Sequence, residues 1–125
     1  MSFDWGAYLP IAVELAARDG DEAAARSAIG RAYYAALGRA ASLLRSEGRD
    51  ISPLQIHGQV GRAFRNNPDA RRSRIGLHLN WLRDERNRAD YVDAANGDAS
   101  KLAREAVLRA RIVLRLLDGL RSPPA

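Results

Sequence analysis

Residues 28–44 read AIGRAYYAALGRAASLL and show a strong helical pattern. Apolar residues recur every three or four positions, which predicts one wide core face on a helix over residues 22–46. The predicted core positions are Ile29, Ala32, Tyr33, Ala36, Leu37, Ala40, Leu43 and Leu44. A second row on this helix contains small residues and one tyrosine: Ser27, Gly30, Tyr34, Gly38 and Ala41. Because a glycine inside a helix costs about 1 kcal/mol relative to alanine, this row predicts that another helix packs closely.

Four further helices are predicted around this one, because the other long segments also have helical rather than alternating periodicity. They extend over residues 4–18, 54–64, 70–92 and 98–120. Gly20 fits a C-terminal cap, and Asp21 fits the N-cap of the central helix. Pro10 suggests that the first regular helix begins later than residue 4, because proline is tolerated only near the start of a helix.

The connections between these helices are short and contain residues typical of turns. Asn96-Gly97 separates two helical patterns rather than two strands. The sequence therefore predicts an all-α protein, an up-and-down bundle of four long helices plus a short helix. A single domain is expected over residues 1–121, followed by a frayed tail over residues 122–125.

The composition excludes several kinds of site. The chain has 125 residues, no cysteine and two histidines, so disulfides and thiolate or histidine-based metal clusters are not expected. We expect no cofactor. The sequence has no apolar run of roughly 18 residues, and its first residues do not resemble a signal peptide. A cytoplasmic protein without a membrane segment is therefore expected.

Positive charge is concentrated in the middle of the chain. The net charge is +5, and residues 62–88 contain eight arginines and only three acidic residues. Guanidinium groups bind phosphate in a bidentate manner, so this cluster indicates contact with a nucleic acid or nucleotide. The alternative is a solvated basic face. Compositional bias explains why 19 of the 20 basic residues are arginine, but it does not explain their clustering.

The densest charged run is LRDERNRADY, residues 82–91. Arg86, Asn87, Asp90 and Tyr91 lie within about one and a half helical turns and offer a cation, an amide, a carboxylate and a phenol. They form a candidate catalytic set. The structural alternative is that Arg86 and Asp90 form an intrahelical ion pair worth about 0.3–0.5 kcal/mol, with Tyr91 as a core aromatic residue.

Other residues are candidates for phosphate binding. Arg83 and Arg88 flank Arg86 on the predicted helix. Arg31 and Tyr34 share a face of the central helix, so they are expected to form a cation–π pair. Arg31 is also expected to pair with Asp90 if their two helices are neighbours.

The two histidines allow alternative interpretations. His57 is either a packed side chain that bonds to the backbone or a phosphate contact. His78 is expected at the boundary of the core, on a side of its helix similar to that of Arg86.

Three segments together resemble the higher eukaryotes and prokaryotes nucleotide-binding (HEPN) domain family. They are RSAIGRAYYA at residues 26–35, His57-Gly58, and RNRADY at residues 86–91, preceded by Trp5, Tyr8, Leu9 and Ala12. The resemblance implies a bundle of four long helices and a short one, usually as a homodimer, and the small-residue row favours such a dimer. It also implies RNA or nucleotide binding or, in active members, a metal-independent endoribonuclease at the dimer interface. Many bacterial members form a toxin–antitoxin pair with a small nucleotidyltransferase.

Placed on this motif, Arg86 corresponds to the catalytic arginine and Asn87 to the polar residue that follows it. The family's histidine is missing: with four intervening residues its place is taken by Tyr91, and with five or six by Val92 or Asp93. A tyrosine phenol has a reference pKa near 10 and is a poor base at neutral pH. Three functions remain open: a binding protein with a degenerate ribonuclease motif, an active ribonuclease that uses Asp90, Tyr91 or His78 as its base, and a structural interaction module.

Overall fold

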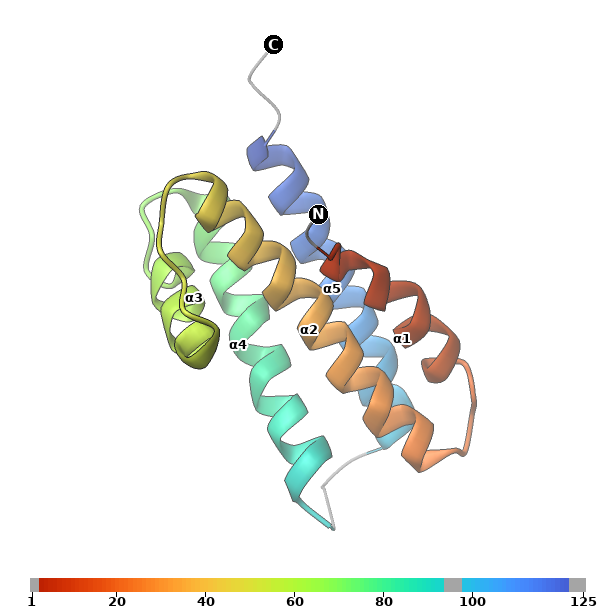
Figure 1. The fold of residues 1–125 in the computed structure, drawn as a ribbon. Coiled ribbons are helices and arrows are strands. Elements are labelled where there is room, and N and C mark those ends of the chain that lie inside the picture. The colour runs from red at the N-terminus through yellow and green to blue at the C-terminus, as the bar shows by residue number, and fades with distance from the viewer. Residues whose placement is uncertain (1–2, 94–97, 122–125) are drawn as a thin grey trace.

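The computed structural model describes residues 3–93 and 98–121, which form a helical bundle (Figure 1). The elements are a 3-10 turn η1 (Trp5–Ala7), then α1 (Tyr8–Ala16), α2 (Glu22–Ser46), a 3-10 turn η2 (Pro53–Gln55), α3 (Ile56–Phe64), α4 (Ala70–Tyr91) and α5 (Ala99–Arg121). The described residues contain no strand, so the all-α prediction is confirmed. The predictions for Asn96-Gly97 and for the tail at 122–125 lie outside the described residues.

Helix α2 is the centre of the bundle. It contacts α1, α3, α4 and α5, and in Figure 1 it lies between α1 and α4 with α5 behind. Consecutive long helices run in opposite directions in this view. None of the helices within the described ranges combines the length and the apolar composition that crossing a membrane requires.

The ends of α2 follow from local chemistry. Asp21 caps the helix, because its Oδ1 accepts a hydrogen bond from the amide of Ala24 at 3.0 Å. Gly20 and Gly48, on either side of the helix, have φ angles of +78° and +87°. These left-handed conformations suit glycine, which has no Cβ to clash. The prediction of a helix over residues 22–46 is therefore confirmed.

The first helix is shorter than predicted. Regular α-helix begins at Tyr8, after the 3-10 turn that Asp4 caps, and ends at Ala16. Pro10 has no amide hydrogen to donate to Gly6, so the chain makes a tighter turn before the helix. The bundle consequently has three helices of 22–25 residues and two of nine residues, rather than four long helices and one short helix.

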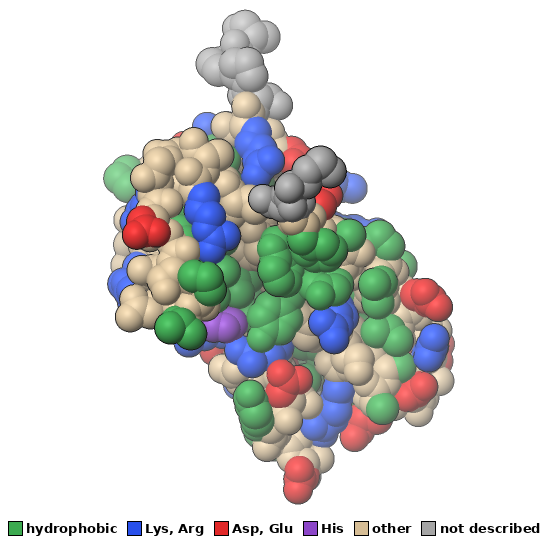
Figure 2. Space-filling view, viewed as in Figure 1, with side chains coloured by type: hydrophobic (Ala, Val, Ile, Leu, Met, Phe, Trp, Pro, Cys, Tyr) green, Lys and Arg blue, Asp and Glu red, His purple; other side chains and the backbone are tan. Residues whose placement is uncertain are grey.

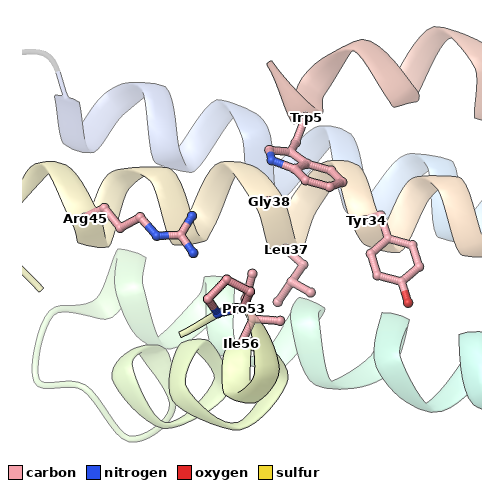
Figure 3. Close-up of a pocket in the computed structure, with 7 residues that line it drawn as sticks. All are labelled: Trp5, Tyr34, Leu37, Gly38, Arg45, Pro53 and Ile56. Atoms are coloured by element: carbon pink, nitrogen blue, oxygen red, sulfur yellow. The ribbon is translucent and has the colours of Figure 1, made fainter. Parts of the chain in front are cut away.

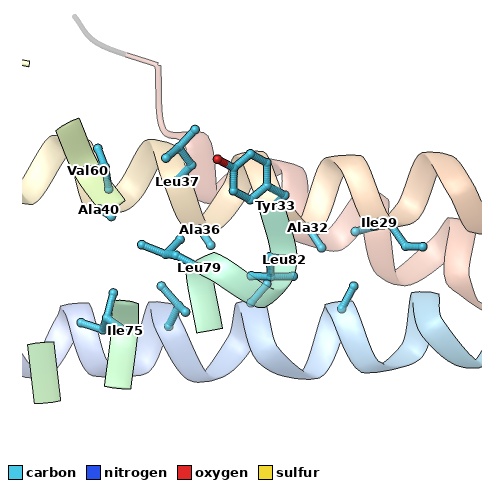
Figure 4. Close-up of a cluster of buried hydrophobic side chains, with 14 of the residues drawn as sticks. Ile29, Ala32, Tyr33, Ala36, Leu37, Ala40, Val60, Ile75, Leu79 and Leu82 are labelled. Carbon is cyan, nitrogen blue, oxygen red and sulfur yellow. The ribbon is translucent and has the colours of Figure 1, made fainter. Parts of the chain in front are cut away.

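The core forms where α2 packs against α4 and α5 (Figure 4). Every predicted core position of α2 is buried. From α4, Ile75, Leu79 and Leu82 face this surface. Leu77, which the sequence placed among the apolar residues of α4, is 69% exposed. It lies two residues from both Ile75 and Leu79, and therefore on the other side of the helix.

The two glycines of the small-residue row are both covered by side chains of the same chain. A Cβ atom on Gly38 would lie 2.1 Å from Cγ of Trp5, so the indole packs directly against the backbone of α2. A Cβ atom on Gly30 would lie 4.0 Å from Cγ of Arg86. The predicted close packing against the small residues of α2 is therefore present, but the packing groups are Trp5 of η1 and the side chain of Arg86 rather than the backbone of another helix. Because the same chain already covers both glycines, the small-residue row gives no support to the predicted homodimer.

Candidate functional site

Arg86 is a buried cation that lacks a close partner. It lies on the side of α4 that faces α2, with its stem over Gly30 and its side chain only 10% exposed. Its Nη1 is 3.6 Å from Oδ2 of Asp90 on the next turn of the helix. Its Nε is buried and has no hydrogen-bond partner among the described residues. A buried guanidinium without its full set of partners is costly, and an anion would supply the missing acceptors.

Two adjacent tyrosines of α2 lie beneath this guanidinium. Its central carbon is 5.4 Å from the ring centroid of Tyr33 and 5.7 Å from that of Tyr34. Cation–π contacts of this kind contribute up to about 2 kcal/mol when they are desolvated. The tyrosine faces partly balance the charge, but they accept none of the arginine's hydrogen bonds in the plane of the guanidinium.

His57 joins the site from α3. Its Nδ1 is 2.6 Å from the hydroxyl oxygen of Tyr33, and the two rings are stacked with centroids 5.6 Å apart. Burial raises the pKa of Tyr33 to about 12, so its hydroxyl keeps its proton. Burial, and then the positive charges of Arg86 and Arg83, lower the pKa of His57. The imidazole is therefore neutral at pH 7, and its Nε2 has no partner in residues 3–93 and 98–121.

Arg83 is a second arginine close to these residues. It lies one turn before Arg86 on α4, and its charge acts on both Tyr33 and His57. Together with Tyr33 and His57 it lines a small cavity of about 50 Å³, which is large enough for water but not for an organic ligand. We call Tyr33, Tyr34, His57, Arg83 and Arg86 the Arg86 cluster. It consists of two arginines, one histidine and two tyrosines that form an aromatic floor, and the nearest carboxylate to Arg86 is that of Asp90 at its edge.

The structure brings together part of the predicted site. Arg83, Arg86, Tyr34 and His57 meet in the Arg86 cluster, although they come from three helices. The Arg86–Asp90 ion pair is present, and Asp90 is 42% exposed. Asn87 and Tyr91 lie on the exposed side of α4. Tyr91 is 75% exposed, so the expectation that it is a core aromatic residue is wrong.

Arg31 and Arg88 lie outside the cluster. Arg31 lies over Tyr8 of α1 at 5.0 Å, rather than over Tyr34. The expected Arg31–Asp90 pair is absent from the described part of the chain, where the carboxylate of Asp90 pairs with Arg86. Arg88 pairs with Glu85 at 2.5 Å. Two residues correspond to about 200° of rotation on a helix, so Arg88 points away from Arg86.

Arg26 has a structural role that the sequence did not reveal. Its guanidinium donates hydrogen bonds to the carbonyl oxygens of Ala89, Val92 and Asp93 at 3.0, 2.8 and 3.0 Å. These carbonyls lie in the last turn of α4 and just beyond its C-terminus, where a cation is favoured. The residue thereby anchors the end of the helix that carries Arg86. Its partners are 63–67 residues away in the sequence, and no local pattern indicates such a contact.

His78 belongs to a different cluster. It is half-buried, as predicted, but its Nδ1 is 3.4 Å from Nη1 of Arg109 on α5. Burial and the charges of Arg109 and Arg74 lower its pKa. Arg109 lies 4.4 Å from the ring centroid of Trp81. His78 therefore faces α5, while Arg86 faces α2.

The described side chains of histidine, aspartate and glutamate form no group of three or more that could hold a metal ion. Comparison with known proteins gives no matching family model, no matching curated protein and no matching solved structure. The chemistry of the Arg86 cluster is therefore the basis for a function.

Proposed function

We propose that this chain is a HEPN-like helical bundle that binds the phosphate of an RNA or nucleotide at the Arg86 cluster. One observation supports the proposal above all others. The guanidinium of Arg86 is buried, and among residues 3–93 and 98–121 its Nε has no hydrogen-bond partner and its one carboxylate neighbour is 3.6 Å away. A phosphate oxygen would accept from this guanidinium at short distance, in the bidentate geometry that arginine favours.

The surrounding groups suit the same ligand. Arg83 adds a second positive charge, and Nε2 of His57 offers a third polar contact. Hydrogen bonds between charged partners contribute about 1.5–3 kcal/mol each. Asp90 is partly exposed to water, so solvent screens its repulsion of the ligand. A phosphate entering this cluster would gain more from the two arginines than it loses to one carboxylate.

The HEPN-like interpretation adds partners to this proposal. The family resemblance favours a homodimer, in which we expect a second copy to cover the exposed side of α4, where Asn87 and Tyr91 lie. A small nucleotidyltransferase acting as antitoxin is the partner that the family resemblance favours. Co-purification with the product of a neighbouring gene tests for the antitoxin partner. Sedimentation of the purified chain tests for the homodimer.

Binding is tested by fluorescence anisotropy with a labelled single-stranded RNA, in salt from about 50 to 200 mM. We expect wild-type affinity to fall as salt rises, because bound phosphate displaces counterions. Arg86→Met keeps an unbranched stem over Gly30 but removes the charge, and we expect it to lose binding. Arg109→Met is the matched control and should bind as wild type does. If wild type does not bind, a structural interaction module is the better description.

A second candidate function is metal-independent RNA cleavage, favoured by one specific observation. The neutral imidazole of His57 lies in the same cluster as Arg86 and Arg83, so under this proposal a histidine from α3 would take the role of the one that the motif lacks. In this reaction His57 takes the proton of the 2′-hydroxyl and the oxygen attacks the adjacent phosphorus. The bond to the 5′-oxygen breaks, that oxygen takes a proton from water, and a 2′,3′-cyclic phosphate remains. Arg86 stabilises the charge on the phosphate.

Cleavage is tested separately from binding. Wild type is incubated with RNA in excess chelator, and the products are analysed for cyclic phosphate ends. We expect His57→Gln and Arg86→Met to abolish cleavage, and His78→Gln to retain it. Cleavage that survives His57→Gln but is lost in Asp90→Asn or Tyr91→Phe would instead assign the base to α4.

A further inference from the structure

A preformed apolar pocket lies beside the Arg86 cluster. It has a volume of about 280 Å³ and is lined by Trp5, Tyr34, Leu37, Gly38, Arg45, Pro53 and Ile56 (Figure 3). In this view the indole of Trp5 approaches from one side of α2, and Pro53 and Ile56 approach from the other. Tyr34 and Arg45 lie at opposite ends. A pocket of this size accommodates a planar ring system but not a folded peptide.

The walls of the pocket are fixed by contacts within the chain. Trp5 cannot move toward α2, because its ring already touches the backbone at Gly38. On the other side, Arg45 donates a hydrogen bond to the carbonyl oxygen of Ile51 at 2.9 Å. This bond holds the loop that leads into η2, which begins at Pro53. The pocket therefore does not need to form when a ligand arrives, which lowers the cost of binding.

The apolar pocket and the Arg86 cluster share a wall. The ring of Tyr34 lines the pocket, and the same ring lies under the guanidinium of Arg86 and 6.1 Å from the ring of His57. Leu37 lines both the pocket and the small cavity next to Arg83. Figure 2 shows the surface that results: hydrophobic side chains gather over α2 between α1 and α3, with histidine and basic side chains beside them.

We propose that this composite surface binds one unpaired nucleotide, with its base in the pocket between Trp5 and Tyr34 and its phosphate at Arg86. The inference rests on the proposed function and names its ligand. Aromatic side chains stack on any base, and each such contact contributes about 1–3 kcal/mol. The walls are apolar and the neighbouring cluster is cationic, which matches the two ends of a nucleotide. A base paired in a duplex cannot enter the pocket, so the ligand is a free nucleotide or a unit of single-stranded RNA.

Tryptophan fluorescence tests the position of the base. Trp81 contacts Arg109 on another face, so in a Trp81→Phe background Trp5 is the only tryptophan. The probes are adenosine monophosphate, ribose 5-phosphate, a short single-stranded RNA and the same RNA as a duplex. We expect adenosine monophosphate and single-stranded RNA to quench Trp5, and the other two to leave its emission unchanged. Quenching by the mononucleotide alone would identify a free nucleotide as the ligand, and quenching by the RNA alone would identify the polymer.

A blocking variant tests the pocket independently by calorimetry. Ile56→Trp fills the apolar volume, and Leu108→Trp adds the same ring at an exposed site of α5. We expect Ile56→Trp to weaken adenosine monophosphate at least about tenfold without changing the affinity for ribose 5-phosphate, and Leu108→Trp to change neither. If both ligands bind wild type equally and lose binding only in Arg86→Met, the base pocket is wrong while the phosphate site stands. If Arg86→Met also leaves single-stranded RNA binding unchanged, the phosphate site itself is refuted.

Discussion

Two arginines in this bundle lie over aromatic rings beside a histidine, but their charges are balanced differently. Arg109 lies over Trp81, its Nε donates to Glu105 at 3.0 Å, and its side chain is 27% exposed. Arg86 lies over two tyrosines and is far more buried, yet its carboxylate is 3.6 Å away and its Nε is unpaired. Within the described residues, Nε of Arg109 has a carboxylate partner, whereas Nε of Arg86 has none.

Under the proposed function, this difference separates a structural arginine, Arg109, from a ligand-binding one, Arg86. A surface ion pair between Arg109 and Glu105 is an ordinary stabilising contact on one helix. A buried and incompletely paired cation is generally less stable than an apolar side chain of similar size. We therefore expect Arg86 to contribute no net stability, which is the pattern expected where a side chain is kept for a ligand.

The largest expected effect is on binding affinity, where substitution of Arg86 and substitution of Arg109 should differ. Arg86→Met should weaken phosphate-dependent binding by about 2 kcal/mol, or roughly 30-fold, without lowering the free energy of unfolding in urea. Arg109→Met should leave binding unchanged and cost about 0.5–1 kcal/mol of stability. The opposite result, with Arg86→Met unstable but still binding, would show that Arg86 is a packing residue.

A smaller effect is expected from the hydrogen bond that ties α3 to the Arg86 cluster. Tyr33→Phe removes the hydroxyl that contacts His57 and leaves a half-buried nitrogen without a partner. We expect the free energy of unfolding to fall by about 1 kcal/mol, measured by urea denaturation. Tyr34→Phe is the matched control, because its hydroxyl has no hydrogen bond among the described residues, and it should change stability by less than Tyr33→Phe does. Equal losses in the two variants would contradict this assignment.

The carboxylates next to the two arginines should also behave differently. Asp90→Asn removes a negative charge from the edge of the Arg86 cluster, so we expect RNA affinity to rise about threefold at low salt. Glu105→Gln removes the corresponding charge beside Arg109 and should have no effect on affinity. Anisotropy titrations of both variants measure this, and weaker binding by Asp90→Asn would mean that Asp90 contacts the ligand or positions Arg86.

The smallest expected effect is the pH dependence of stability that the two histidines contribute. Both have lowered pKa values, so the unfolded chain binds protons near pH 6.5 that the folded chain does not. Their stabilising contribution is therefore complete above about pH 6.5 and is lost as the pH falls through the folded pKa values. Proton NMR titration of the folded chain should show a lowered pKa for both imidazole rings. Bound nucleotide should raise the pKa of His57 and leave that of His78 unchanged; equal shifts would place the phosphate elsewhere.

Much of the fold could be predicted from the sequence, because local signals determine it. The limits of α2 follow from Asp21 and Gly48, and its core face follows from a regular apolar period. The first helix was overestimated because its apolar pattern continues through residues where Pro10 prevents regular helical bonding. Helical periodicity shows which residues share a face, but it does not show where regular hydrogen bonding begins.

The candidate site was only partly predictable. Arg86 and Arg83 stand out through local charge density, and His57 is one of two histidines in the sequence. The inward direction of Arg86 and the contact of Arg26 with the end of α4 depend on how α2 and α4 pack, which no short segment encodes. Tyr91 was misassigned because an aromatic residue in the last turn of a helix can extend beyond the neighbouring helices into solvent.

The contact between Trp5 and Gly38 has a consequence for how this sequence can change over time. No side chain fits at position 38 while an indole occupies the space 2.1 Å from its would-be Cβ. A substitution there is tolerated only after position 5 has become smaller, and the reverse order would expel the N-terminal turn. Positions 5 and 38 are therefore expected to vary as a pair among descendants of this chain, so that substitution at one is accompanied by substitution at the other.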